Sequence, residues 1–488
     1  MDRAATAIRV LTARSRTIPA ARRLRPDGAV EVVFRTVVEQ SAAHGELAVS
    51  ADGSAVAVWL PRSAEAPADE EPLPDRLARL RAFLRLTEQR HDPPDQEETM
   101  PVTHEIVAGG GGDFLTVPHL TATGSQAEIG RAYAAQARRV LGWAPVPADP
   151  VKARARRAWF ARHWPQHLAR MQGAAEAIGV DPEADDVYLD GLTGVPDGSA
   201  CSASYYPPAA TADGRAVLGR NYDFFTTSAT ELFALMSGAP VPELAERPMS
   251  SRPHVLTSVP DDGPATTLLT MNELDGCMEG VNEHGLAVAL LIADVESVSA
   301  PVDAGPQVGV SSVQLPRYLL DTCASAAEAL DALYAAKQYD LGTPLHHLVG
   351  DPSGDAFVWE RGPGGDERAV RVAAGALCVT NHLLHRHEGA HDLPPDTAES
   401  LLTYQRYRTI SEHSAGPGLS AARMREALDA ARVDARSGTS YPVRTLWRSV
   451  FDLERATMAT RFYLGDATDG SPRYSEELEF PVPVLQRG

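Results

Sequence analysis

Cys201 lies in the stretch GSACSAS, where every neighbouring side chain is small, and Arg220 and Asp223 follow in GRNYDFF. Small residues let a backbone bend and let another group approach its carbonyl closely. The turn signal at Asp213-Gly214 predicts two antiparallel strands that bring the cysteine beside a cation and a carboxylate. Such surroundings can stabilise a thiolate, the reactive form of cysteine. The pattern therefore indicates nucleophilic cysteine chemistry.

Two asparagines follow: Asn282 lies in a predicted turn that it is expected to shape, and Asn381 lies at a predicted strand end. GVNEHGL predicts a tight turn that contains Asn282, and ALCVTNHLL predicts a strand that runs into Asn381. Asparagine side chains and backbone N–H groups at such a position suit an oxyanion hole. Each feature also has a structural interpretation: a lone cysteine is commonly a core residue, Arg220 and Asp223 could form an ion pair of the fold, and Asn381 could be a turn residue.

Five stretches in a fixed order carry a resemblance to a known family. They are CSAS with GRNYDF, GVNEHGL, HHLVGDPSGDAFVWE, VTNH and TYQRYR. Together they resemble the N-terminal nucleophile (Ntn) hydrolases, and in particular the acyl-coenzyme A:6-aminopenicillanic acid acyltransferases, with bile salt hydrolases and penicillin V acylases more distant. The resemblance covers residues 114–466, and the part before Cys201 is similar to the propeptide of that acyltransferase family.

The resemblance implies an α+β fold, a four-layer αββα sandwich of two antiparallel sheets between helices. It also implies an inactive precursor in which the cysteine thiol attacks the preceding carbonyl. Hydrolysis of the resulting ester would cut the chain between Ala200 and Cys201, and the two fragments would stay associated. The pair Ala200-Cys201 followed by Ser202 departs from the Gly-Cys-Thr common in relatives. Alanine is still small, so we expect the rate of cleavage to differ more than its occurrence.

The same resemblance implies roles for the site residues. Arg220 and Asp223 would orient the cysteine and its freed amine, and Asn381 would be the oxyanion asparagine. Arg406, in TYQRYR, matches an arginine of a Ser-x-x-Arg-Tyr pattern. Thr403 stands in the serine place. The freed α-amine, with an ordinary pKa of about 7.7–8.0, can serve as the general base at neutral pH.

Two further residues are candidates for substrate binding. Tyr222 lies between the predicted arginine and aspartate, and Asn282 lies in the turn GVNEHGL. The predicted reaction acts on a linear amide C–N bond of a small-molecule substrate through an acyl-Cys201 intermediate. Hydrolysis and acyl transfer both stay open, with no cofactor required and a coenzyme A thioester as one alternative acyl donor. A non-catalytic binding or scaffold protein that retains the fold is the alternative to an enzyme.

The front of the chain predicts a separate segment. ELAVSADGSAVAVWLP predicts a hairpin around Asp52-Gly53, and a helical pattern follows in RLARLRAFLRLTEQR. This part resembles half of a GCN5-related acetyltransferase, without the glycine-rich loop that cradles the cofactor pyrophosphate. We therefore divide the chain into an acetyltransferase-like α/β segment (1–100), a linker (101–112), a propeptide or alpha chain (113–200) and a catalytic beta chain (201–488). Residues 227–253 are interpreted as an insertion or a lid.

Composition excludes several other classes. The net charge of −20 over 488 residues argues against a nucleic-acid partner. No apolar run approaches the ~20 residues of a membrane span, and the arginine-rich start lacks the core of a signal peptide, which predicts a cytoplasmic protein. A homo-oligomer is left open, as is a role in specialised metabolite biosynthesis. HLLHRHEGAH has zinc-like spacing but no acidic or cysteine partner tied to it, so no metal site is predicted, and Cys277, Cys323 and Cys378 are interpreted as core residues.

Overall fold

The computed structural model describes residues 46–49, 56–59, 102–190, 200–237, 240, 247–271, 276–293, 307–340, 344–361, 366–397, 400–439 and 441–483. The chain divides into two units. The first unit comprises Met1–Gln89 with Thr227–Arg247, and the second comprises Arg90–Thr226 with Pro248–Gly488. Every predicted site residue belongs to the second unit.

In the first unit, the strands β1 (Glu46–Val49) and β2 (Val56–Trp59) pair antiparallel, with Glu46 opposite Trp59. This confirms the predicted pair of strands around Asp52-Gly53. Helix α8 (Ala229–Ser237) belongs to the same unit. The helix predicted in RLARLRAFLRLTEQR and most of the acetyltransferase-like segment lie outside the described residues.

The larger sheet of the second unit has nine strands. They are β3 (Val102–Ala108), β4 (Val117–Gly124), β9 (His254–Pro260), β10 (Thr266–Thr270), β11 (Glu279–Asn282), β12 (Ala287–Ile292), β15 (Leu345–Gly350), β16 (Ala356–Arg361) and β17 (Glu367–Val370). Their order in the sheet is β17-β16-β15-β12-β11-β10-β9-β4-β3. Of these pairs, only β4 and β9 are parallel, with His119 opposite Val255. The sheet therefore joins strands from before and after Cys201.

The second sheet has seven strands and carries the cysteine. Its strands are β7 (Ala200–Tyr206), β8 (Val217–Phe225), β18 (Leu377–Val379), β19 (Val443–Asp452), β20 (Thr457–Asp466), β21 (Pro472–Tyr474) and β22 (Leu478–Pro481). The order is β18-β7-β8-β19-β20-β21, and β22 also pairs with β20. Every residue of β7 and β8 is buried. Because both faces of these strands are buried, another layer of the fold must pack on each face of the sheet.

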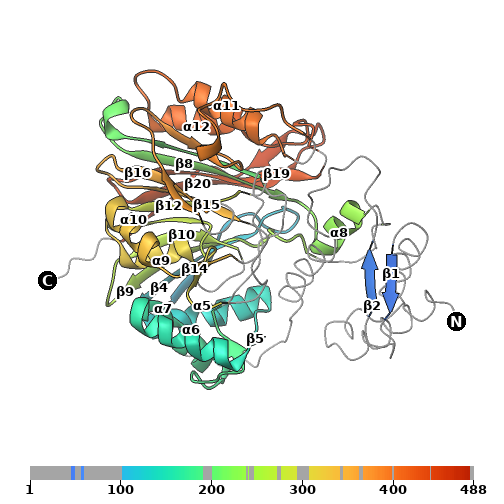
Figure 1. Ribbon diagram of the computed structural model, residues 1–488, viewed down its shortest axis with the longest axis vertical. Coiled ribbons are helices and arrows are strands. Elements are labelled where there is room, and N and C mark those ends of the chain that lie inside the picture. Colours follow the sequence, from blue (N-terminus) through green and yellow to red (C-terminus); the bar gives the residue numbers. More distant parts are fainter. Residues whose placement is uncertain are drawn as a thin grey trace. The chain divides into compact units, whose positions relative to one another are not determined.

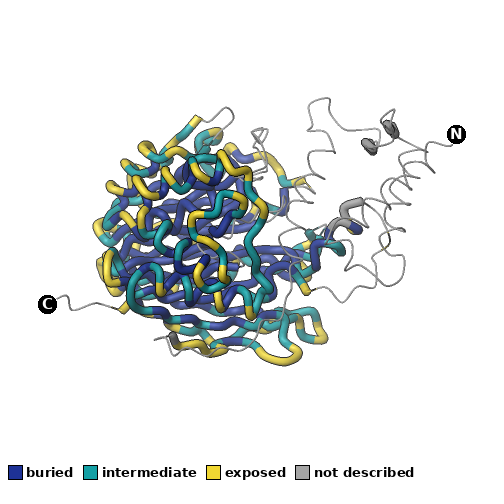
Figure 2. The backbone as a smooth tube through the Cα atoms, turned by 90° about the horizontal axis from the view of Figure 1, so that it is seen from below, coloured by how far each residue is buried: buried dark blue, intermediate teal, exposed yellow. Residues whose placement is uncertain are grey.

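Helices cover the outer faces of the two sheets (Figure 1). Helices α5 (Gln126–Leu141), α9 (Leu315–Thr322) and α10 (Ala326–Ala335) pack against strands of the nine-stranded sheet. Helix α7 (Pro165–Ile178) packs on α5, and α6 (Pro150–His163) packs on α7. Helices α11 (Thr403–His413) and α12 (Ala421–Ala430) pack on the seven-stranded sheet, and β7 faces β12 and β15 of the other sheet. Buried residues concentrate on the strands between these helices (Figure 2). The predicted four-layer αββα sandwich is confirmed.

Short pieces complete the second unit. Two small strand pairs are β5 (Val146–Pro147) with β6 (Val187–Tyr188), and β13 (Val310–Ser311) with β14 (Gln338–Tyr339). Two 3-10 helices span Pro208–Ala210 and Leu384–Arg386. Among the described residues, none of the helices combines the length and the apolar character that crossing a bilayer requires.

The helix ends follow the local chemistry of the sequence. Ser125 and Glu128 form the reciprocal hydrogen bonds of a capping box at the start of α5. Helix α6 ends before Pro165, which cannot donate the next backbone hydrogen bond and instead occupies the first turn of α7. Gly179 ends α7 with a φ of 70°, a left-handed conformation that favours glycine.

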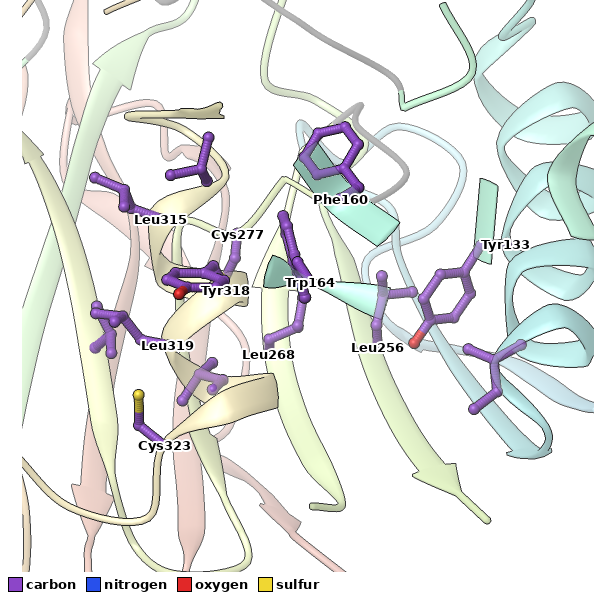
Figure 3. Packing of buried hydrophobic residues seen from close by; sticks show 14 of the residues in the cluster. Tyr133, Phe160, Trp164, Leu256, Leu268, Cys277, Leu315, Tyr318, Leu319 and Cys323 are labelled. Atoms are coloured by element: carbon purple, nitrogen blue, oxygen red, sulfur yellow. The ribbon is translucent and has the colours of Figure 1, made fainter. Parts of the chain in front are cut away.

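One hydrophobic core joins the part of the chain before Cys201 to the part after it (Figure 3). Tyr133, Phe160 and Trp164 come from the helical segment before the cysteine, and they belong to the same buried cluster as Leu256 and Leu315. Because the two parts bury apolar surface jointly, this core is complete only when both parts are present.

Buried ion pairs reinforce this junction. Arg170 of α7 forms an ion pair with Asp321 of α9, and Arg317 donates to the same carboxylate at 2.9 Å. The indole of Trp164 also donates to Asp321, at 2.9 Å. Arg156 of α6 pairs with Asp190, which also precedes Cys201. Arg156 crosses the junction by donating to the carbonyl of Gln307 at 2.7 Å and to the hydroxyl of Tyr339. The carboxylate of Asp321 thus links helices that lie on either side of Cys201 in the chain.

We expect Asp321→Asn to destabilise the second unit by about 3–5 kcal/mol, because it removes the negative charge that two buried guanidinium groups contact. The matched control is Glu176→Gln, since the Arg131–Glu176 pair is partly exposed, with side-chain exposures of 33% and 50%. This control should cost no more than about 1 kcal/mol. Urea unfolding of the full chain measures both, and equal losses would contradict the assigned role of Asp321.

Candidate active site

The antiparallel pairing of β7 with β8 places the predicted residues side by side. Cys201 lies opposite Tyr222, Ala203 opposite Arg220, and Ala200 opposite Asp223. Side chains directly opposite each other in such a pair share one face of the sheet. Cys201, Arg220 and Tyr222 therefore share a face, and Arg220 shows that this face is the inner one, because it contacts the nine-stranded sheet.

Arg220 links the thiol to the opposite sheet. Its guanidinium donates to Cys201 Sγ at 3.4 Å and to the carbonyl of Leu290 on β12 at 2.5 Å. It also forms an ion pair with Glu279 of β11, and both side chains are fully buried. Burial lowers the pKa of Arg220, but the thiol and Glu279 together raise it by a larger amount. The net shift of the pKa is therefore upward, and the guanidinium stays charged.

Arg406 and Asp223 approach Cys201 from the helical layer on the other side. Arg406 of α11 donates to the carbonyl of Cys201 and lies 3.5 Å from Asp223 Oδ2. Thr445 of β19 donates to Asp223 Oδ1 at 2.5 Å. Burial raises the pKa of Asp223 to about 6, although Arg406, Thr445 and Arg220 all lower it. At neutral pH the carboxylate is mostly ionised, and near pH 6 it exchanges a proton.

Asn381 holds the backbone nitrogen of Cys201. Its Oδ1 accepts from Cys201 N at 2.8 Å and from Arg406 Nη2 at 2.7 Å. Its Nδ2 donates to the carbonyl of Ile292 at 2.7 Å. Two donors on one atom and a carbonyl on the other fix the orientation of the amide. In the intact chain Asn381 therefore orients the nitrogen of Cys201, and the predicted oxyanion role would require the bond to Ile292 to open.

The thiol itself differs from the sequence-based prediction. Burial raises the pKa of Cys201, and Arg220 and Arg406 counteract this shift only in part. The prediction of a stabilised thiolate is therefore wrong for the intact chain, because removal from water destabilises a thiolate more than the two neighbouring guanidinium groups stabilise it. Reaction at neutral pH needs a group that accepts the thiol proton.

The two predicted substrate-binding residues have different surroundings. Tyr222 stacks on Trp447 with ring centroids 3.9 Å apart, and its hydroxyl donates to Met271 Sδ at 2.8 Å. It remains next to the thiol. Asn282 instead binds its own turn, where Oδ1 accepts from His284 N at 3.1 Å, and Nδ2 donates to the carbonyl of Cys323 at 2.8 Å after α9. None of its described hydrogen bonds reaches Cys201, so the structure corrects Asn282 to a turn-stabilising residue.

Sequence reasoning missed two residues of this site. Glu279, in CMEGVNEHG, is the carboxylate partner of Arg220, and Thr445, in YPVRTLW, binds Asp223. A charged residue in an otherwise apolar strand was the available signal for Glu279, since buried charges are generally paired. Thr445 had no such signal, because threonine is common in strands.

The other cysteines and the histidine-rich stretch do not form a second centre. Cys277, Cys323 and Cys378 are buried with raised thiol pKa values, which burial causes in each case. Within the described residues, no group of three or more histidine, cysteine, aspartate or glutamate side chains is arranged to hold a metal ion. His385 binds Glu360 at 2.7 Å and thereby anchors the loop after Asn381.

We expect the raised pKa of Asp223 to make stability depend on pH. In the unfolded chain this carboxyl titrates near its ordinary value of about 3.9, so its ionisation destabilises the fold above about pH 6, and the penalty disappears as the pH falls towards 4. In a Cys201→Ala background, an additional Asp223→Asn should flatten the pH dependence of unfolding between pH 4.5 and 7.5, by on the order of 2–3 kcal/mol. Urea unfolding across this range tests it. Identical pH profiles for the two chains would contradict the assignment.

A family model described as acyl-coenzyme A:6-aminopenicillanic acid acyl-transferase matches residues 210–466, more than half of the chain. That range includes Arg220, Asp223, Asn381 and Arg406. No curated protein is a detectable match by sequence.

Several solved structures resemble the chain at low identity. Penicillin V acylase from Agrobacterium tumefaciens is 17% identical, with a TM-score of 0.36, over 56% of this chain and 84% of its own. A mutant of conjugated bile acid hydrolase from Clostridium perfringens is 14% identical, with a TM-score of 0.39, over 59% and 97%. A Caenorhabditis elegans N-acylethanolamine-hydrolyzing acid amidase ortholog is 16% identical, with a TM-score of 0.35, over 58% and 100%.

The match covers the strand with Arg220 and Asp223, the asparagine at Asn381 and the arginine of α11, which are the groups that surround Cys201 here. The protein is thus an enzyme of the Ntn-hydrolase type, and the chain belongs to the acyl-coenzyme A:6-aminopenicillanic acid acyl-transferase family.

Proposed function

We propose that the chain cuts itself between Ala200 and Cys201, and that the freed Cys201 is the nucleophile of an amide hydrolase or acyltransferase. One observation carries this proposal: separate side chains hold the sulfur, the nitrogen and the carbonyl of the same residue. Arg220 contacts the sulfur, Asn381 the nitrogen and Arg406 the carbonyl. A purely structural cysteine needs none of these contacts. These contacts suit a residue that supplies both the nucleophile and the base.

The cleavage step would start from the neutral thiol. Asp223 lies on the other face of β8 from the sulfur and contacts Arg406, so we propose that it orients the Cys201 backbone through that guanidinium. The sulfur attacks the carbonyl carbon of Ala200, the C–N bond breaks, and the nitrogen of Cys201 takes up the thiol proton. The resulting thioester reacts with water, which leaves a carboxylate on Ala200 and regenerates the thiol.

After cleavage, base and nucleophile belong to one residue. The α-amine of Cys201 would accept the thiol proton while the sulfur attacks the carbonyl of the substrate, and the protonated leaving amine departs. The acyl-Cys201 intermediate then passes its acyl group to water or to a second amine. We propose a small-molecule amide or acyl substrate, for which a coenzyme A thioester remains one alternative acyl donor, and a cytoplasmic location.

The two fragments are proposed to remain one particle. Strands β3 and β4 would belong to the first fragment, yet β4 pairs with β9 of the second fragment over six residue pairs. The shared core and the Arg170–Asp321 ion pair join the fragments further. Separation would expose an unpaired strand edge and apolar surface to water, which makes it unfavourable.

We expect the purified wild-type protein to give two fragments on a denaturing gel, residues 1–200 and 201–488, with the larger beginning CSASYY. Cys201→Ala should remain one chain, since it lacks the sulfur. Cys378→Ala is the matched control: Cys378 is also buried and lies on the neighbouring strand β18, but it binds Ser204, at 3.1 Å. That variant should be cut like the wild type. A wild-type chain that stays full-length after long incubation would refute the proposal.

We also expect the cleaved fragments to elute together in gel filtration without denaturant, and to separate only in denaturant. Native mass spectrometry should give the mass of the uncut chain plus one water. Recovery of residues 1–200 as a separate species under native conditions would show that the junction described above does not hold the fragments together.

A further inference from the structure

The backbone is strained where helix α11 begins. Leu401 has a φ of 48° and Leu402 a φ of 62°. Residues other than glycine rarely adopt this left-handed backbone conformation. The leucine side chain cannot form the local hydrogen bond by which asparagine or aspartate offsets the steric cost. Such strain persists only where the surrounding structure enforces it, and it concentrates at functional positions. Two successive strained leucines immediately before Thr403 therefore need an explanation.

Asp396 enforces this conformation from outside the helix. Its carboxylate accepts from the backbone N–H groups of Tyr404, at 3.1 Å, and Gln405, at 2.8 Å. It also accepts from the hydroxyl of Ser400 at 2.7 Å, and Ser400 in turn accepts from Thr403 N through its carbonyl at 3.0 Å. A carboxylate in this place satisfies backbone donors that the first turn leaves open. The start of α11 is thereby fixed.

The fixed turn contacts two residues of the site. The hydroxyl of Thr403 accepts from the backbone N–H of Asn381 at 2.8 Å and donates to Thr380 Oγ1 at 2.9 Å. The carbonyl of the strained Leu401 accepts from Arg406 Nε at 3.3 Å. Thr403, Asn381 and Arg406 are all buried. One turn thus sets the backbone of the residue that holds Cys201 N and the guanidinium that holds the Cys201 carbonyl.

We propose that Thr403 is a positioning residue for the chemistry at Cys201. Its hydroxyl satisfies the buried N–H of Asn381 and fixes the side chain of that residue against the nitrogen of Cys201. The strained backbone before it sets the register in which Thr403 meets Asn381 while Arg406 meets Leu401. This inference rests on the proposed function and assigns to α11 the alignment of the bond that breaks. Thr403 touches neither the sulfur nor the bond itself.

The test compares Thr403→Val with Thr403→Ser in the full chain. Valine keeps the shape of threonine but cannot accept from Asn381 N, whereas serine keeps the hydroxyl. We expect Thr403→Val to slow first-order self-cleavage by about tenfold or more, the scale on which one buried hydrogen bond acts, and Thr403→Ser to stay within about threefold of wild type. In protein that has matured, kcat towards p-nitrophenyl acetate should fall for the valine variant while KM changes little.

Thr409→Val is the matched control, because it makes the same substitution further along α11 and should cleave like wild type. Thermal unfolding and circular dichroism verify folding, and Thr403→Ala, which also lacks the hydroxyl, replaces the valine variant if that one does not fold. Wild-type cleavage rates in Thr403→Val or Thr403→Ala would overturn this inference alone. A wild-type chain that is never cut would instead overturn the proposed function.

Discussion

The ion pair between Arg220 and Glu279 is the interaction on which the site depends. It crosses the interior of the sandwich, with the arginine on β8 of one sheet and the glutamate on β11 of the other, and both side chains are fully buried. Removing two charges from water is costly, and the attraction between the two side chains offsets this cost only while both keep their positions. The same guanidinium contacts Cys201 Sγ at 3.4 Å. The packing of the sheets therefore fixes the position of the thiol.

Burial shifts the pKa values of two groups near this pair. It raises the pKa of the Cys201 thiol, which keeps the sulfur neutral in the intact chain. It also raises the pKa of Asp223 to about 6, so this carboxyl group titrates near neutral pH. Low polarity strengthens every remaining hydrogen bond to Asn381 and Arg406. A single physical cause, exclusion of water, thus keeps the thiol neutral and brings the titration of Asp223 close to neutral pH.

The part of the chain before Cys201 is a structural component of the same body. It contributes β3 and β4 to the nine-stranded sheet and helices that bury Tyr133, Phe160 and Trp164 in the common core. Such an arrangement explains how a chain could be cut next to a fully buried strand without losing its fold. The bond in question lies at the start of β7, where pairing with β8 holds the residues on its C-terminal side.

Local sequence determined much of this protein. The capping box at Ser125 and the helix break at Pro165 were predictable, because caps and breaks depend on neighbouring residues. The five stretches that contain Cys201, Arg220, Asp223, Asn381 and Arg406 were identified through their resemblance to a family. Tertiary structure alone decided the rest. Glu279 became the partner of Arg220 and Cys201 a neutral thiol, since each outcome depends on which distant groups share its buried surroundings. Charge pairing and desolvation act through space, and no spacing along the chain encodes them.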